Sequence, residues 1–129
     1  MNNRITQSVT DKPHCTEIWM CWLENKDGSV QSGYRPVYIA SNDMNNKYST
    51  TLNVIPITSK KKKPLPIHVD LDSYQEYGLC SQSTMLVEQI MTVSVSALHK
   101  RIGKIADSET LRKISAALAI QIPNFAETR

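Results

Sequence analysis

The sequence predicts a small, mainly β domain with one helix: an antiparallel barrel or sandwich that carries a C-terminal amphipathic helix. Two observations support this fold class. Short apolar and β-branched runs recur along the chain between loops rich in Asn, Gly, Ser and Pro, as is typical of antiparallel barrels and sandwiches. One stretch near the C-terminus, residues 107–123, instead has apolar residues at helical spacing.

Two strands near the N-terminus are predicted to form a hairpin. The first, Glu17–Leu23 (EIWMCWL), is apolar and aromatic, and it precedes a turn-rich segment with Asp27-Gly28, a hairpin-type signal. The second is Arg35–Ser41 (RPVYIAS). Pro36 has no N–H to donate to a neighbouring strand, so we expect it among the first residues of this strand or at a sheet edge.

The remaining strands are shorter and less regular. Thr51–Ser59 alternates like a strand, although Pro56 indicates an irregular or edge position. Further strands are predicted in the segments IHVDL (67–71), TMLVEQIMTV (84–93) and IGKI (102–105). Residues 94–103 are expected to form one or two helical turns, with Ser94 or Ser96 as the cap.

The one longer helix is predicted to begin at a cap formed by Asp107 or Ser108 and to end before Pro123. Its apolar residues recur every three or four positions, which gives the helix one apolar face for packing on the β core. These residues are Leu111, Ile114, Leu118 and Ile122.

Length and composition indicate a single soluble domain. The chain has 129 residues, the size of one ordinary domain, which we divide into a polar N-terminal extension (1–16), the folded domain (17–123) and a C-terminal tail (124–129). No apolar run approaches the ~20 residues of a membrane span, and the N-terminus lacks the apolar stretch of a secretory signal. A cytoplasmic protein is therefore expected, without contact to a membrane.

The sequence offers no pattern for a metal or cofactor. The three cysteines are odd in number and show no close-pair spacing, so we expect reduced thiols. The histidines, His14, His68 and His99, are scattered, and surface or packed positions explain them better than a metal site does. No nucleophile elbow, phosphate-binding glycine loop or dinucleotide fingerprint occurs.

Four consecutive lysines stand in the segment Ser59–Pro66, SKKKKPLP. Adjacent lysines repel one another and usually mark a solvated loop. A cluster of ammonium groups also displaces counterions from a nucleic-acid backbone without reading the bases. The two interpretations are compatible, and the segment follows directly on the hydroxyls of Thr58 and Ser59.

Four short motifs, in this order, resemble the MazF/PemK family of toxin endoribonucleases from toxin–antitoxin pairs. They are Gly-x-Arg-Pro at Gly33–Pro36, Asn-Asp at Asn42–Asp43, Ile-Thr-Ser at Ile57–Ser59 and Glu-Gln-Ile at Glu88–Ile90. The resemblance extends from about Glu17 to Ile122. It implies a small SH3-like antiparallel barrel, usually dimeric, that cuts single-stranded RNA without a metal and is held inactive by a cognate antitoxin with an acidic, disordered segment.

The resemblance implies that Arg35 and Thr58 are the catalytic residues. Metal-independent cleavage lets the ribose 2′-hydroxyl attack its own phosphate, so charge gathers on the phosphoryl oxygens, and a guanidinium presents several donors in a fork that suits them. Thr58 would donate its hydroxyl to the same phosphate. Two plainer interpretations stand beside these: a salt bridge from Arg35 to Glu17, Glu24 or Asp43, and a β-branched strand residue at position 58.

RNA binding is expected from three further groups of residues. The loop before the second strand can stack on unstacked bases and hydrogen-bond to them, the lysine segment can contact phosphates, and a Glu-Gln pair inside a strand can reach the groove or face opposite sides of the sheet. The residues are Gln31, Ser32, Gly33, Tyr34, Ser59, Lys60, Lys61, Lys62, Lys63, Glu88 and Gln89.

The chain departs from the family pattern at three places. Val30 stands where many members carry an acidic residue, Met91 where an arginine is common, and Thr16-Glu17 where Gly-Asp commonly opens the first strand. The alternative to an endoribonuclease is therefore a binding module of the same fold, such as the CcdB toxins that bind DNA gyrase, or a decayed toxin that still binds its antitoxin.

Overall fold

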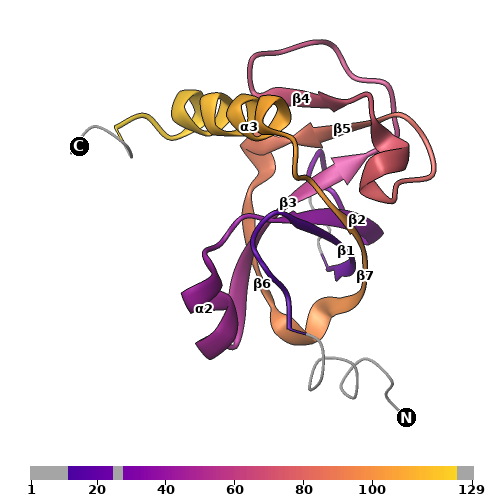
Figure 1. The fold of residues 1–129 in the computed structure, drawn as a ribbon. Helices are drawn as coiled ribbons and strands as arrows, with labels where there is room; N and C mark the ends of the chain where they lie inside the picture. The colour runs from indigo at the N-terminus through magenta and orange to yellow at the C-terminus, as the bar shows by residue number, and fades with distance from the viewer. Residues whose placement is uncertain (1–11, 25–27, 125–129) are drawn as a thin grey trace.

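The computed structural model describes residues 12–24 and 28–124, and it contains seven strands and two α-helices within them (Figure 1). Residues 1–11 of the predicted extension, Asp27 of the predicted turn and residues 125–129 of the tail lie outside the described residues. The elements are β1 (Glu17–Leu23), β2 (Gly33–Ile39), α2 (Asp43–Tyr48), β3 (Thr51–Thr58), β4 (His68–Leu71), β5 (Ser83–Leu86), β6 (Met91–Ser94), β7 (Leu98–Lys104) and α3 (Ser108–Gln121).

The strands form one antiparallel sheet in the order β4-β5-β3-β2-β1-β7, with β6 also paired to β3. The predicted small antiparallel fold with a C-terminal helix is confirmed, with the difference that no ladder between described strands closes the sheet into a barrel. The strand β3 is shared: its first half pairs with β6 through Val54, and its end pairs with β5 from Ile57. Pro56 lies between these two pairings, so its position is irregular as predicted, but β3 is not an edge strand.

Two predicted segments are divided differently. The run 84–93 is not one strand, because the chain turns at Val87–Gln89 between β5 and β6 to reach both halves of β3. Residues 94–103 form only one 3₁₀ turn, capped by Ser94, before pairing with β1 as strand β7. The short helix α2, capped by Asn42, was not predicted from the sequence.

The helix α3 lies against β4 and the Val87–Gln89 turn at one end of the molecule (Figure 1). Its cap is Asp107, which accepts hydrogen bonds from Thr110 N (3.0 Å) and from the hydroxyl of Tyr77 (2.6 Å). Ile114 is buried with 3% exposure, and together with Ala117 it belongs to a core that includes side chains of β3, β4 and β5. The predicted apolar face is thus confirmed, except that Ile122 follows the helix and is exposed.

Two glycines allow a close approach between β7 and the turn before β5. A Cβ atom added to Gly103 would lie 2.0 Å from the carbonyl oxygen of Tyr77, and one added to Gly78 would lie 1.9 Å from that of Ile102. Both distances are far below any van der Waals contact between a Cβ and an oxygen, so this backbone crossing requires glycine on both sides.

Candidate RNA-cleavage site

The loop between β1 and β2 holds Arg35 by a hydrogen bond. Gly33 has a φ of +86°, a conformation that glycine adopts without a Cβ penalty. This bend leads into Arg35, whose Nε donates to the carbonyl oxygen of Ser32 at 2.6 Å. The guanidinium is therefore fixed through Nε, while its two terminal nitrogens have no hydrogen bond to the described part of the chain.

The alternative salt bridges of Arg35 are not found among the described residues. Glu17 is buried and accepts instead from Arg101 (3.1 Å), from Trp19 Nε1 (2.9 Å) and from the backbone N–H of His14 (2.8 Å). The carboxylate of Asp43 accepts from the backbone N–H of Cys15 at 2.7 Å. These carboxylates have other partners, so the positive charge of Arg35 is not neutralised by them.

Gln89 fastens the loop that precedes Arg35 to the Val87–Gln89 turn. Its Oε1 accepts from Gln31 N at 2.8 Å, and its Nε2 donates to the carbonyl oxygen of Ser29 at 3.0 Å. The prediction that Gln89 lies inside a strand is wrong, because the turn between β5 and β6 carries it. Gln89 thus spans the distance between two loops that are about sixty residues apart in sequence.

Thr58 lies at the end of β3 and is buried, with 1% exposure. The β2–β3 ladder ends at the pair Val37–Pro56, and beyond it Ile57 and Thr58 pair with β5. The hydroxyl of Thr58 accepts from Lys60 N at 3.2 Å, which leaves its own proton available to an acceptor. Arg35 and Thr58 lie on the neighbouring strands β2 and β3, each just beyond the last pair of the ladder that joins them.

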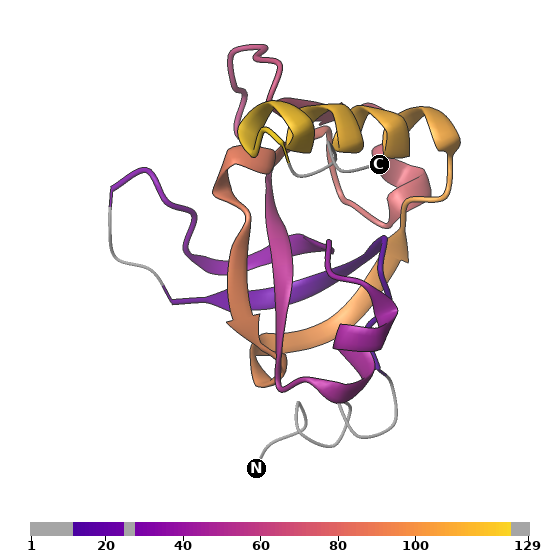
Figure 2. The same cartoon turned by 90° about the vertical axis from the view of Figure 1, so that its left-hand side faces the viewer.

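In Figure 2 the lysine segment rises at the top of the molecule beside α3, whereas the β1–β2 hairpin extends to the left of the view. The four lysines of the segment, Lys60–Lys63, are all exposed. At its base, His68 contacts the carbonyl oxygen of Lys63 through Nδ1 (3.2 Å) and Glu88 Oε2 through Nε2 (3.1 Å). Ser59, Lys60, Lys61 and Lys62 also line a hollow of about 480 Å³ beside β4 and β5.

Glu88 and Gln31 each contain a buried oxygen that no described residue satisfies. These are Glu88 Oε1 and Gln31 Oε1. Buried acceptors are nearly always hydrogen-bonded in folded proteins, to protein or to another molecule. Gln31 contacts Gln89 through its backbone, and Glu88 precedes Gln89 in the Val87–Gln89 turn. The β1–β2 loop and this turn therefore each contain an acceptor oxygen without a hydrogen bond to the described residues.

A second hollow, of about 450 Å³, lies on the other side of Arg35. Arg35, Tyr34 and Ser59 line it together with Lys100 and the residues 78–81. At its rim the predicted residue Tyr34 contacts two side chains that sequence reasoning missed: the ring centres of Tyr34 and Trp22 lie 4.5 Å apart with the planes tilted by 42°, and the Tyr34 hydroxyl is hydrogen-bonded to His99. The paired register of Trp22 with Tyr34 across the hairpin is the signal that would have revealed the contact with Trp22.

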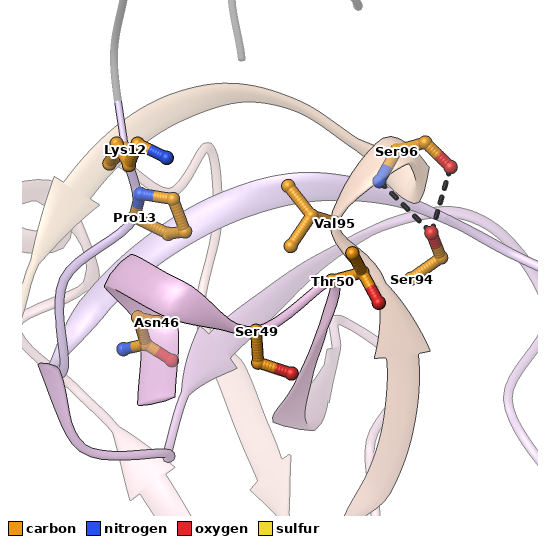
Figure 3. Close-up of a pocket in the computed structure, with 8 residues that line it drawn as sticks. All are labelled: Lys12, Pro13, Asn46, Ser49, Thr50, Ser94, Val95 and Ser96. Atoms are coloured by element: carbon orange, nitrogen blue, oxygen red, sulfur yellow. Dashed lines mark hydrogen bonds between the residues drawn. The ribbon is translucent and has the colours of Figure 1, made fainter. Parts of the chain in front are cut away.

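A further hollow lies away from these residues (Figure 3). It has a volume of about 370 Å³ and is formed by the N-terminal segment, α2 and the turn after β6. Ser94 and Ser96 on its wall are hydrogen-bonded to each other, and the amide of Asn46 is bonded to Ser41. None of the predicted site residues lines it.

Comparison with known proteins identifies the family. The family model of the PemK-like, MazF-like toxin of type II toxin–antitoxin systems matches residues 14–122. The chain belongs to this toxin family. It is 38% identical over 107 residues to the endoribonuclease EndoA of Bacillus subtilis (strain 168), an alignment that covers 82% of this chain and 90% of the relative.

Solved structures of MazF proteins share the fold. The crystal structure of MazF (form I) from Deinococcus radiodurans superposes with a TM-score of 0.71 at 19% identity, covering 84% of this chain and 94% of that one. A MazE–MazF structure (form II) from the same organism gives a TM-score of 0.66 at 16% identity, covering 87% and 96%. Across the described residues of this family member, no helix is long and apolar enough to cross a membrane.

Proposed function

We propose that this toxin is an endoribonuclease that cleaves single-stranded RNA by attack of a ribose 2′-hydroxyl on the adjacent phosphodiester, without a metal ion. The observation that carries the proposal is the fixed guanidinium of Arg35, bonded to Ser32 and not neutralised by a carboxylate of the described chain. A relative with 38% identity is named an endoribonuclease, which supports the same activity.

Arg35 stabilises the charge that develops on the phosphoryl oxygens, and Thr58 is the second proposed donor to that phosphate. Removal of one preorganised donor of this kind lowers the rate by about a hundredfold or more. Because Thr58 also accepts from Lys60 N, its hydroxyl orients the first residue of the lysine segment. Through Thr58, the proposed site at the reacting phosphate is therefore joined to the lysines that would bind the neighbouring phosphates of the RNA.

The remaining predicted residues hold the RNA. The exposed lysines contact phosphates, and Tyr34, with the tilted ring of Trp22 beside it, offers a face for an unstacked base. The unpaired oxygens of Gln31 and Glu88 are buried, so a base with an exocyclic amino group would reach them only when the surrounding loops open. Gln89, Ser32 and Gly33 act mainly through the shape of the loop, since both Gln89 contacts and the Ser32 carbonyl are used within the protein.

We also propose an antitoxin partner and a homodimer in the cytoplasm, where mRNA is available. MazE–MazF complexes are among the structures with this fold, and an acidic, disordered segment would meet Arg35 and Lys60–Lys63 with an affinity that weakens as salt rises. A dimer would cover exposed apolar side chains such as Ile120 and Ile122 at the C-terminal end of α3. The apolar segment 85–93 offers less surface for such a contact than its sequence indicates, because Met85, Leu86 and Val87 are buried within the protomer.

The test is cleavage of an end-labelled single-stranded RNA in EDTA, with mass spectrometry of the products. The expected products end in a 2′,3′-cyclic phosphate, and Arg35→Ala slows the single-turnover rate at saturating RNA by about a hundredfold or more. As the matched control, glutamine at positions 60–62 weakens binding and flattens its salt dependence by roughly 0.7 per lost contact, with little change in that rate. RNA left intact by the wild-type protein would favour the gyrase-type binding module.

A further inference from the structure

His68 is the first residue of β4, and its side chain is largely buried, with 8% exposure. Its two ring nitrogens both face groups that only accept hydrogen bonds, the carbonyl oxygen of Lys63 (3.2 Å) and the carboxylate of Glu88 (3.1 Å). A neutral imidazole has one N–H and can satisfy only one of them. The ring lies within hydrogen-bond distance of both acceptors at once, one at each nitrogen.

The backbone contact of His68 is at the middle of the lysine segment. At the start of this segment, Lys60 N donates to the hydroxyl of Thr58, and at its end His68 N donates to the carbonyl oxygen of Leu65. Between these points, in residues 61–64, the Lys63 carbonyl is the one backbone group with a hydrogen bond to the described chain. The side chain of His68 is thus the internal restraint on a segment whose charges repel one another.

We propose that His68 is a positioning residue that holds the lysine segment in the shape that binds RNA phosphates. The contact with Glu88 fixes the ring of His68, the ring fixes the Lys63 carbonyl, and the four ammonium groups start from a restricted set of positions. A restrained segment loses less conformational freedom when RNA binds than a free one does, so His68 raises affinity without touching the RNA. This inference rests on the proposed function of the same groove.

Glu88 connects His68 to the turn that also holds the β1–β2 loop. Glu88 belongs to the Val87–Gln89 turn, and the next residue, Gln89, fastens the β1–β2 loop. The same turn therefore sets the lysine segment through Glu88 and His68, and the Arg35 loop through Gln89. The Val87–Gln89 turn therefore influences two parts of the site through separate side chains. Glu88 acts on the residues that bind the neighbouring phosphates, and Gln89 acts on the position of the catalytic guanidinium.

Two substitutions separate the two contacts of His68. In His68→Asn the amide nitrogen takes the place of Nδ1 and keeps a donor for the Lys63 carbonyl, whereas in His68→Gln it takes the place of Nε2 and keeps only the contact with Glu88. The readouts are KM and kcat for cleavage of labelled single-stranded RNA, and Kd by fluorescence anisotropy over a range of salt concentrations. His14→Asn, at an exposed histidine, is the matched control.

We expect His68→Gln to raise KM and Kd by about tenfold, with kcat within about twofold of wild type, and His68→Asn to keep both constants within about twofold. Thermal melting shows whether each variant is folded. Equal effects of the two substitutions, or none from either, would overturn the role of the Lys63 contact. A lower kcat at unchanged KM would instead place His68 in the chemistry. Absence of cleavage by wild type refutes the proposed function alone, since the Kd comparison still decides the role of His68.

Discussion

Replacement of Gln89 by alanine should detach the β1–β2 loop and slow cleavage, although Gln89 makes both of its hydrogen bonds within the protein. The side chain accepts from Gln31 N and donates to the carbonyl oxygen of Ser29. Both partners precede the residue, Ser32, that holds Arg35. If the loop detaches from the Val87–Gln89 turn, the Ser32 carbonyl that holds the Arg35 guanidinium moves with it.

The magnitude follows from the two hydrogen bonds. Each contributes about 1 kcal/mol net, so Gln89→Ala should weaken docking of the loop by roughly 2 kcal/mol, or about 30-fold in the docking equilibrium. Gln89→Glu keeps the acceptor for Gln31 N but loses the donor to Ser29, and we expect about half of this effect. The value of kcat/KM should fall by up to about 30-fold in the alanine variant and by about fivefold in the glutamate variant.

Hydrogen exchange of the Gln31 amide, measured beside RNA cleavage, tests this reasoning. The amide should exchange up to about 30-fold faster in Gln89→Ala, with Gln89→Glu between the alanine variant and wild type. Gln75→Ala, at an exposed glutamine, is the control and should leave both measurements unchanged. Unaltered protection of the Gln31 amide in Gln89→Ala would refute the tether, and a slower reaction with unaltered protection would assign Gln89 to direct RNA contact.

Two further predictions concern stability. Gly103→Ala should lower the free energy of unfolding by several kcal/mol, because the new methyl group overlaps the carbonyl of Tyr77; a denaturant titration showing less than about 1 kcal/mol would contradict the close approach. Hydrogen bonds from Thr110 and Tyr77 lower the pKa of Asp107 from 3.8 to about 2. The ionised carboxylate thus adds stability above pH 4 that disappears as the pH falls to 2, and Asp107→Asn should remove this part of the pH dependence in acid titrations.

Local pattern was sufficient to predict most of the strands and the C-terminal helix. The apolar run of β1 and the helical spacing around Ile114 are local signals, and the structure confirms both elements. The sequence did not predict that residues 84–93 form two strands separated by a turn. A run of buried residues such as Met85–Val87 has the same sequence pattern whether the strand continues or ends at a turn. The choice between them depends on the partners along β3, which are distant in sequence.

Motif resemblance proposes the residues of the candidate site, but it carries no information about their contacts. The structure places Arg35 and Thr58, the two proposed catalytic residues, on the neighbouring strands β2 and β3. The tether of Gln89 and the two contacts of His68 had no sequence signal, because each joins residues 5 to 60 positions apart through a side chain whose orientation depends on the turn. A scattered histidine and a Glu-Gln pair acquire their roles only when the sheet is assembled.

The pairing of β1 with β7 has a consequence for synthesis on the ribosome. β1 is the first strand of the sheet to be made and β7 the last, and the buried Glu17 finds its Arg101 partner only across this ladder. Contacts between such distant residues form late in folding, and a nascent chain that stops before residue 98 has none of β7. The β1–β2 hairpin, which contains Arg35, then lacks the neighbouring strand β7, and Glu17 lacks its ion-pair partner Arg101. A ribosome that makes this toxin thus nearly completes the chain before the sheet that supports the guanidinium can assemble.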